Sequence, residues 1–317
     1  MSYMILTVIS FLTFQFAGCG STSTNQYGKS YNDDASEAEM SANTRKSGGI
    51  IANRNASTGP IMIVASDDDT DYAPMDLLNL EGSDQLHWIF IKGGSFGMGS
   101  DDYENEKPIH QIFLPDYEML ETEVTVGAYR ECVLDNVCIG LKTTGGIWAD
   151  CNWSYEDRND HPMNCVDWYQ ADEFCRWAGG KLPSEAQWEY AAGLQKKTLD
   201  YSRRYRAPDC TDVITAENGK GCNRDSTWPV CSKQVGHTTL ELCDMIGNVS
   251  EWIEDTWHDN YHDAPSDGSA WLSDGDEMRV LRGGSWQLNV PDMMRVSFRR
   301  EFPEDVADIG IGFRCVR

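Results

Sequence analysis

The chain has 317 residues, of which 40% are hydrophobic and eleven are tryptophan, which is enough apolar material for one sizeable folded core. Lys and Arg number 26 against 51 Asp and Glu, giving a formal net charge of −25. Such an acidic chain repels nucleic acid, so we expect no nucleic-acid partner. The acidity is typical either of a surface that only keeps the protein in solution or of one that binds cations.

The first 19 residues have the character of an export signal. An apolar run from Met4 to Ala17 is too short to span a bilayer as a mature helix. The motif FAGC, ending at Cys19, resembles the lipobox of bacterial lipoproteins, in which the cysteine is lipid-modified and becomes the mature N-terminus. We therefore expect a lipoprotein signal peptide over 1–19 and a lipid-anchored location in the bacterial cell envelope, at the outer membrane or cell surface. The alternative is an ordinary secretory signal cleaved nearby.

Residues 20–85 predict a flexible, acidic and Ser-rich tether. Stretches such as GSTSTNQYGKSYNDDASEAEM contain too few large apolar side chains to offset the entropy lost on ordering. The segment SDDDTDYAP could be taken for a calcium loop, but no glycine turn and closing glutamate follow at the required spacing. We therefore interpret it as a charged linker.

Ten cysteines remain when Cys19 is set aside, and their number is even. No pair has the C-x2-C spacing of a zinc site, and the export signal places the chain in an oxidising compartment. These observations predict five disulfides, whose full connectivity the spacing does not determine. The ten are Cys132, Cys138, Cys151, Cys165, Cys175, Cys210, Cys222, Cys231, Cys243 and Cys315.

Residues 86–317 contain the signals of a folded domain. HWIFIKGGSFGMGS alternates and then breaks into glycines, which predicts a strand followed by tight turns. Thr125 is placed to cap a short helix, and Ser184 with Gln187 forms a capping box for another. Between them, VDWYQADEFCRWAGG predicts a helix with one apolar face made of Trp168, Ala171, Phe174, Cys175 and Ala178.

The helical signal fades after Gly193, where short, aromatic, glycine-punctuated segments begin. The fold class expected from this pattern is α+β, with much irregular backbone held by disulfides.

Six segments of this domain, in order, resemble the sulfatase-modifying factor family, whose best-known member is formylglycine-generating enzyme. They are GGSFGMGS, ETEVTVGAY, HPMNCVDWYQADEFCRWAGGKLPSEAQWEYAAG, LCDMIGNVSEW, RVLRGGSW and GFRCVR. The resemblance covers about residues 86–317 and implies the sulfatase-modifying-factor fold, which is related to C-type lectins. It also implies a disulfide between Cys175 and Cys315.

The family's copper site is where this sequence departs from the pattern. The resemblance places two Cu(I)-binding cysteines, spaced C-x4-C, after the Gly-Gly-Ser turn, and this chain has Leu288 and Met293 at those positions. No cysteine occurs between Cys243 and Cys315, so no shift of alignment supplies one. Because Cu(I) is a soft ion that favours thiolate ligands and this chain lacks the cysteine pair, we expect no copper.

Three further positions correspond to the family's active-site region. Ser250 stands where the family usually has a tryptophan, while Ser285 and Arg295 remain as polar candidates. The alternative for Arg295 is an ion pair, which is common in so acidic a protein.

The resemblance also implies a calcium ion. Its ligands would be the side chains of Asp244 and Glu251 and the backbone carbonyls of Gly247 and Val249, all of them oxygen donors suited to a hard cation. A second calcium site could include Asn223. The spacing of the six histidines matches no metal-binding motif. The sequence therefore neither indicates nor excludes iron.

Two classes of function follow. The first is a calcium-stabilised, non-catalytic module that binds a protein, peptide or glycan ligand around Trp286 to Arg300. The second is an oxidase of the wider family, of the formylglycine-generating or non-heme-iron type, acting on an exported substrate. Bound redox metal and dioxygen uptake distinguish the second from the first, because function depends on the site and not on the fold.

Overall fold

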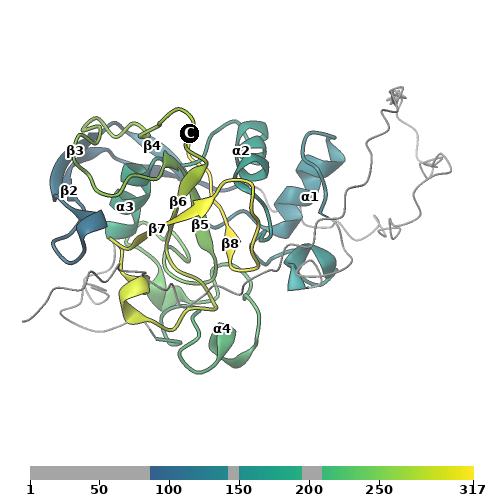
Figure 1. Cartoon of the computed structure of the whole chain (residues 1–317). Helices are drawn as coiled ribbons and strands as arrows, with labels where there is room; N and C mark the ends of the chain where they lie inside the picture. The colour runs from purple at the N-terminus through teal and green to yellow at the C-terminus, as the bar shows by residue number, and fades with distance from the viewer. Residues whose placement is uncertain (1–85, 142–149, 195–208) are drawn as a thin grey trace, which may run out of the picture. The chain divides into compact units, whose positions relative to one another are not determined.

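The computed structural model describes residues 86–141, 150–194 and 209–317 (Figure 1). The predicted signal peptide, the lipidated Cys19 and the tether lie outside the described residues. Within the described part of the chain, no helix is long and apolar enough to cross a membrane.

Three small sheets form the β structure. Two are antiparallel pairs, which join β1 (Trp88–Ile91) to β4 (Tyr117–Leu120) and β2 (Gly94–Met98) to β3 (His110–Leu114). The third has four strands in the order β7-β6-β5-β8, and only β8 is parallel to its neighbour. Its strands are β5 (Ser250–Thr256), β6 (Met278–Arg282), β7 (Arg299–Pro303) and β8 (Ile311–Gly312).

Side-chain caps start the three main helices. The Thr125 hydroxyl accepts the Ala128 N–H at 3.1 Å at the start of α1 (Val126–Leu134). Ser184 and Gln187 form the predicted capping box of α3 (Glu185–Gly193). The start of α2 (Trp168–Trp177) has a second capping box, made by Asp167 and Gln170, that the sequence reading missed.

The remaining helical segments are single turns, and those after Gly193 lie where the helical signal was predicted to fade. They are η2 (Glu104–Glu106), η4 (Asn152–Ser154), α4 (Lys220–Asn223), η5 (Gln234–Gly236) and η6 (Pro291–Met294).

The four-stranded sheet lies between α2 and α3 (Figure 1). On one side, the predicted apolar face of α2 packs Phe174 against Phe313, in a core that also contains Trp252. On the other, Trp188 and Ala192 of α3 belong to a second core cluster with Ile253 of β5. β5 contributes to both clusters and is therefore held firmly. The loop that precedes β5 and the turn that follows its neighbour β6 are held in place with it.

Five disulfides join all ten cysteines of the folded domain. Four close short loops of 6 to 14 residues, Cys132–Cys138, Cys151–Cys165, Cys210–Cys222 and Cys231–Cys243. The fifth, Cys175–Cys315, spans 140 residues and ties α2 to the end of the chain. This is the pair that the resemblance implied, and its long loop removes the most entropy from the unfolded chain.

Charged side chains are buried beside α3. Glu185 receives hydrogen bonds from Arg299 at 2.7 and 2.8 Å and from Arg282 at 3.1 Å, and Arg282 also pairs with Glu189. All four side chains are at most 7% exposed. These pairs connect β6 and β7 to α3 through buried ion pairs.

Asp255 adds a pH-sensitive group to this interior. Burial, followed by the Glu185 carboxylate, raises its pKa from an ordinary value of 3.8 to about 7. Its oxygens accept the backbone N–H groups of Glu185 and Trp271, both at 2.9 Å.

Asp255→Asn should reveal this group as a pH-dependent term in stability. Because the folded state holds the Asp255 proton more tightly than the unfolded state, the contribution of this proton to stability is complete below about pH 4. It is lost as the pH rises towards the folded-state pKa of about 7. We therefore expect the melting temperature of the unchanged protein, minus that of the variant, to fall between pH 4 and pH 8. A difference that stays constant across this range would show that Asp255 titrates normally.

Candidate functional site

The Gly-Gly-Ser turn after β6 holds the segment that the resemblance places at the active site. Gly283 and Gly284 have φ values of +89° and +73°, and a Cβ on Gly284 would lie 2.5 Å from the Met294 sulfur. Position 284 therefore requires glycine for two reasons, its positive φ and the lack of space for a Cβ. The turn is also bonded to the loop before β5, because Gly283 O accepts the Gly247 N–H and Trp286 N–H donates to Asn248 O.

Gly310 brings the two serines of the predicted site together. The Ser250 N–H donates to Gly310 O at 2.8 Å. A Cβ on Gly310 would meet Ser285 Oγ at 3.1 Å and Gln287 Oε1 at 2.6 Å, so both side chains lie against this glycine. Both serines are at most 3% exposed. They offer hydroxyl groups for hydrogen bonding, and the Asp308 carboxylate lies against the same glycine, 3.3 Å from the position of that Cβ.

The two positions of the family's copper cysteines lie in a largely apolar setting. Leu288 packs against the second core cluster, and its carbonyl accepts hydrogen bonds from Ala216 N–H and the Thr215 hydroxyl. Met293 is half-buried in η6. Neither residue supplies a thiolate, and all the cysteines of the described segments are already in disulfides.

Arg295 forms a buried ion pair with Glu106, which is the alternative that the sequence left open for it. Its guanidinium donates to both oxygens of Glu106 at 2.8 and 2.5 Å and stacks 4.9 Å from the Tyr103 ring. Sequence reasoning could not place η2, which is almost 190 residues away, beside this arginine.

A cleft of about 130 Å³ opens beside Trp286, and sequence reasoning missed its other walls. Asn152 forms its fixed base, donating to Pro162 O at 2.7 Å and to Thr227 Oγ1 at 2.9 Å. Asn164 orients Asn152 by accepting its backbone N–H at 2.8 Å. The lining residues are Asp150, Asn152, Tyr155, Arg158, Asn164, Lys220, Asp225, Ser226, Thr227, Trp286 and Ile309.

Two cation–ring pairs line this cleft. The Arg158 guanidinium lies 4.0 Å from the Tyr155 ring, and the Lys220 ammonium lies 5.9 Å from the Trp286 ring. These pairs offer stacking faces and hydrogen-bond donors to a polar ligand that has a ring or a planar group. Asp225 also lines the cleft, while Asn223 is exposed at the end of α4 with a positive φ of 69°.

Carboxylates gather at the predicted calcium loop. Asp244 Oδ2 accepts the Cys231 N–H at 2.7 Å, while Glu251 is bonded to Arg314 at 2.7 to 2.9 Å and to the Trp188 indole at 2.8 Å. Glu251 and Arg314 are both fully buried. Glu251 is therefore already paired with a cation from this chain.

Glu123, from the ETEVTVGAY motif, is a third carboxylate here, and its sequence position alone did not indicate a role at this site. Its oxygens accept Val249 N–H at 3.0 Å and the Asn248 amide at 2.7 Å, so it braces the loop. Burial raises its pKa well above the ordinary range, and the carboxylates of Asp244 and Glu251 raise it further. Burial also raises the pKa of Asp244.

The charges of this cluster suit a divalent cation. Three carboxylates and the Arg314 guanidinium leave two negative charges when all are ionised. A cavity of about 210 Å³ is lined in part by Glu123, although neither Asp244 nor Glu251 lines it. Among the described residues, however, these carboxylates do not form a trio of ligand atoms within 4.8 Å of one another. A calcium ion at Asp244 would thus need backbone carbonyls or water to complete its oxygen shell.

The histidines at the end of β5 are not arranged as a helical pair. His258 stacks on Trp271 at 3.6 Å, and its Nε2 lies 2.8 Å from Ser273 Oγ. Residues 257–262, which follow the end of β5 at Thr256, contain no helix. His258 and His262 therefore do not share a helix face.

Comparison with known proteins establishes the family. The family profile described as "Sulfatase-modifying factor enzyme 1-like domain" matches residues 79–317. The chain therefore belongs to the sulfatase-modifying factor family, and its fold is that of the family.

The relatives of this chain are named for different activities. The serine/threonine-protein kinase Pkn1 of Chlamydia trachomatis is 32% identical over 72% of this chain, but the matched region is only 38% of the kinase. The formylglycine-generating enzyme of Streptomyces coelicolor is 29% identical over 72% of this chain and 88% of its own length. The mouse inactive C-alpha-formylglycine-generating enzyme 2 is 30% identical over 49% of this chain and 48% of its own.

Solved structures agree on the fold. PvdO from Pseudomonas aeruginosa is 25% identical, with a TM-score of 0.61 over 73% of this chain and 93% of its own. Variable protein 1 of Treponema denticola is 23% identical, with a TM-score of 0.57 over 72% of this chain and 94% of its own, and indicates the fold alone.

A double-mutant cycle should show that Glu251 and Arg314 stabilise the site as a pair. Removing one partner leaves the other charge buried, so Glu251→Gln and Arg314→Met should each cost about 3–5 kcal/mol. The double variant should cost clearly less than the two costs added together. Denaturant unfolding of the four proteins measures this, and additive losses would show that the two side chains act independently.

Proposed function

We propose that this protein is an envelope lipoprotein whose sulfatase-modifying-factor domain binds a ligand without copper-dependent oxidation. The observation that carries the proposal is the pair Leu288 and Met293 at the positions of the copper cysteines. The Met293 thioether is a soft ligand, but it supplies neither the negative charge of a thiolate nor a thiol that can take part in redox chemistry. The relative named as an inactive enzyme supports the idea that this fold can serve without catalysis.

The cleft beside Trp286 is the proposed ligand site. Its base is a fixed network of amide and hydroxyl groups, and its rim carries the ring of Tyr155 and the cations of Arg158 and Lys220. These groups suit a protein, peptide or glycan ligand with both polar and planar surfaces. Anchoring through Cys19 would present the cleft at the cell envelope.

An oxidase is the alternative function, favoured by the similarity to formylglycine-generating enzyme over most of that enzyme's length. It would act on an exported substrate with a metal bound elsewhere than at Leu288 and Met293, and iron stays open as that metal.

Calcium is the cofactor we propose. Asp244 and the carbonyls of Gly247 and Val249 would hold the ion, and Glu123 and Glu251 would contribute negative charge. When bound, the ion would compensate the negative charges that Glu123 and Asp244 carry once they ionise, and so stabilise the loop beneath the Gly-Gly-Ser turn. Asn223 would belong to a second and separate site.

Asp244→Asn should remove most of the calcium dependence of stability. Calcium at 100 times its Kd should stabilise the unchanged protein by about 2.7 kcal/mol, seen as a rise in melting temperature over a chelator-treated sample. The variant should melt at nearly the same temperature in both conditions. Glu251 is unsuitable for this test because its loss would leave Arg314 unpaired. An equal calcium shift in protein and variant would place the ion elsewhere.

Metal content and dioxygen uptake test the proposed function directly. The full chain should be purified from membranes in detergent, without chelators or a metal-affinity tag. We expect near-stoichiometric calcium, no copper or iron, and no dioxygen consumption with a cysteine-containing peptide.

The matched control is the variant Leu288→Cys/Met293→Cys, which restores the cysteine spacing and should gain copper. Stoichiometric copper or iron in the unchanged protein, together with dioxygen uptake, would show that the protein is an oxidase and not a binding module.

A further inference from the structure

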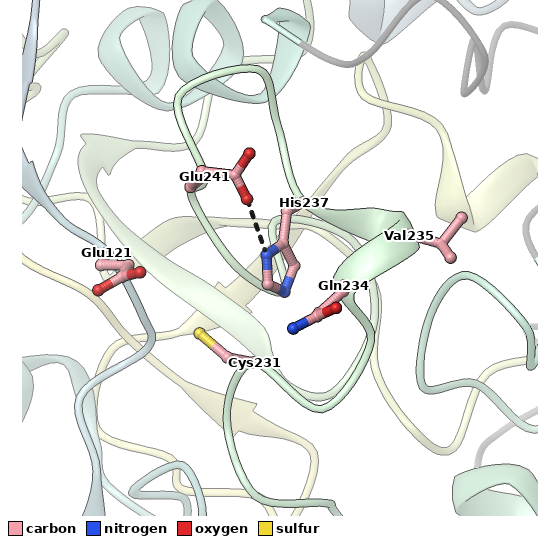
Figure 2. Close-up of a pocket in the computed structure, with 6 residues that line it drawn as sticks. All are labelled: Glu121, Cys231, Gln234, Val235, His237 and Glu241. Carbon is pink, nitrogen blue, oxygen red and sulfur yellow. Dashed lines mark ion pairs between the residues drawn. The ribbon is translucent and has the colours of Figure 1, made fainter.

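A third and larger cavity lies away from Trp286, around the disulfide Cys231–Cys243. Its volume is about 580 Å³ (Figure 2). Figure 2 shows the His237 ring between Glu241 and Gln234, with the sulfur of Cys231 turned toward Glu121. The lining residues are Glu121, Cys231, Gln234, Val235, His237 and Glu241.

His237 is a buried side chain whose hydrogen bonding is incomplete. It is 6% exposed, and within the described segments its Nε2 is buried without a hydrogen-bond partner. Its Nδ1 lies 3.5 Å from a Glu241 oxygen and 3.9 Å from the Cys243 sulfur. A buried imidazole nitrogen without a partner is costly, and this cost points to a ligand that the ring can bind.

Two sulfurs complete a metal-binding arrangement with this ring. Ligand atoms of Cys231, His237 and Cys243 all lie within 4.8 Å of one another, the one such trio among the described residues. In the oxidised protein the two sulfurs are bonded to each other and cannot act as thiolate ligands. The oxidation state of this disulfide therefore decides whether the trio can hold a metal.

We propose that reduction of Cys231–Cys243 converts this cavity into a site for a thiophilic divalent cation such as Zn²⁺. A dithiol supplies two electrons and two protons. The bond between the two cysteine sulfurs breaks, both become thiols, and the dithiol closes into its own disulfide. Binding of the cation then displaces the two thiol protons into solvent.

The chemistry of the ligands favours this class of ion. Two thiolates and a neutral imidazole are three of the four ligands of a tetrahedral zinc site, and the fourth position faces the cavity. The two thiolates neutralise the charge of the cation. The carboxylates of Glu121 and Glu241, which line the cavity, and of Asp244, which bonds to Cys231 N–H, make the surroundings attractive to cations.

The local backbone allows the sulfurs to separate as tetrahedral ligands must. Cys231 is half-buried, and neither cysteine lies in a long helix or a strand. The segment between them contains only the three-residue turn η5. Opening the bridge thus breaks no sheet pairing, and the other four disulfides still close the domain.

Cobalt titration of the full chain tests the proposal, because Co²⁺ bound to thiolates gives intense near-ultraviolet absorption. Before reduction we expect no such band. After mild dithiol treatment we expect one Co²⁺ per chain, displaced by Zn²⁺. Alkylation and mass mapping should show Cys231 and Cys243 as the thiols that Zn²⁺ protects.

Matched variants separate this site from other thiols. Cys231→Ser/Cys243→Ser should abolish the band. Cys210→Ser/Cys222→Ser, which removes another bridge with two half-buried cysteines, should keep it. His237→Ala should weaken binding by at least the roughly 10–100-fold that loss of an outer-shell partner costs.

Three results would overturn the proposal. They are free thiols at Cys231 and Cys243 without a cobalt band, a band that persists in Cys231→Ser/Cys243→Ser, and loss of the near-ultraviolet dichroism of the buried tryptophans when this bridge alone is opened. None of these results bears on the ligand cleft. Because Cys243 directly precedes Asp244 and the Cys231 N–H donates to the Asp244 carboxylate, calcium binding is tested separately, in the oxidised protein.

Discussion

The fully buried ion pair between Glu251 and Arg314 is the interaction on which the rest of this structure depends. Arg314 belongs to the closing GFRC motif, and its guanidinium also donates to Cys243 O at 2.8 Å. It thus fixes the end of the chain to β5 and to the loop before β5 at once. Because the pair has no access to water, either residue alone would be an uncompensated charge in the core.

This pair determines how the functional regions are related. The loop before β5 carries Asp244 and is bonded to the Gly-Gly-Ser turn that positions Trp286. The same loop is tied by Cys231–Cys243 to the cavity around His237. The ligand cleft, the carboxylate cluster and the disulfide cavity are therefore supported by one scaffold, although their chemistry differs.

The acidic composition has a structural counterpart in the interior. Glu123, Glu185, Glu189, Asp244, Glu251 and Asp255 are all buried. Arginines from the C-terminal third of the chain compensate Glu185, Glu189 and Glu251. Glu123 and Asp244 are compensated less fully, which is why burial raises the pKa of both and why we place calcium beside them.

The sequence by itself determined the local features and the family. Helix caps such as Thr125 and Ser184 depend on neighbours three residues away, and six ordered motifs were enough for the sulfatase-modifying factor family. Only the tertiary structure decided which partners meet across the chain, as Arg295 meets Glu106, Glu123 meets the β5 loop, and Asn152 meets Trp286 in one cleft. Residues so far apart in sequence are brought together by packing, which no local spacing encodes.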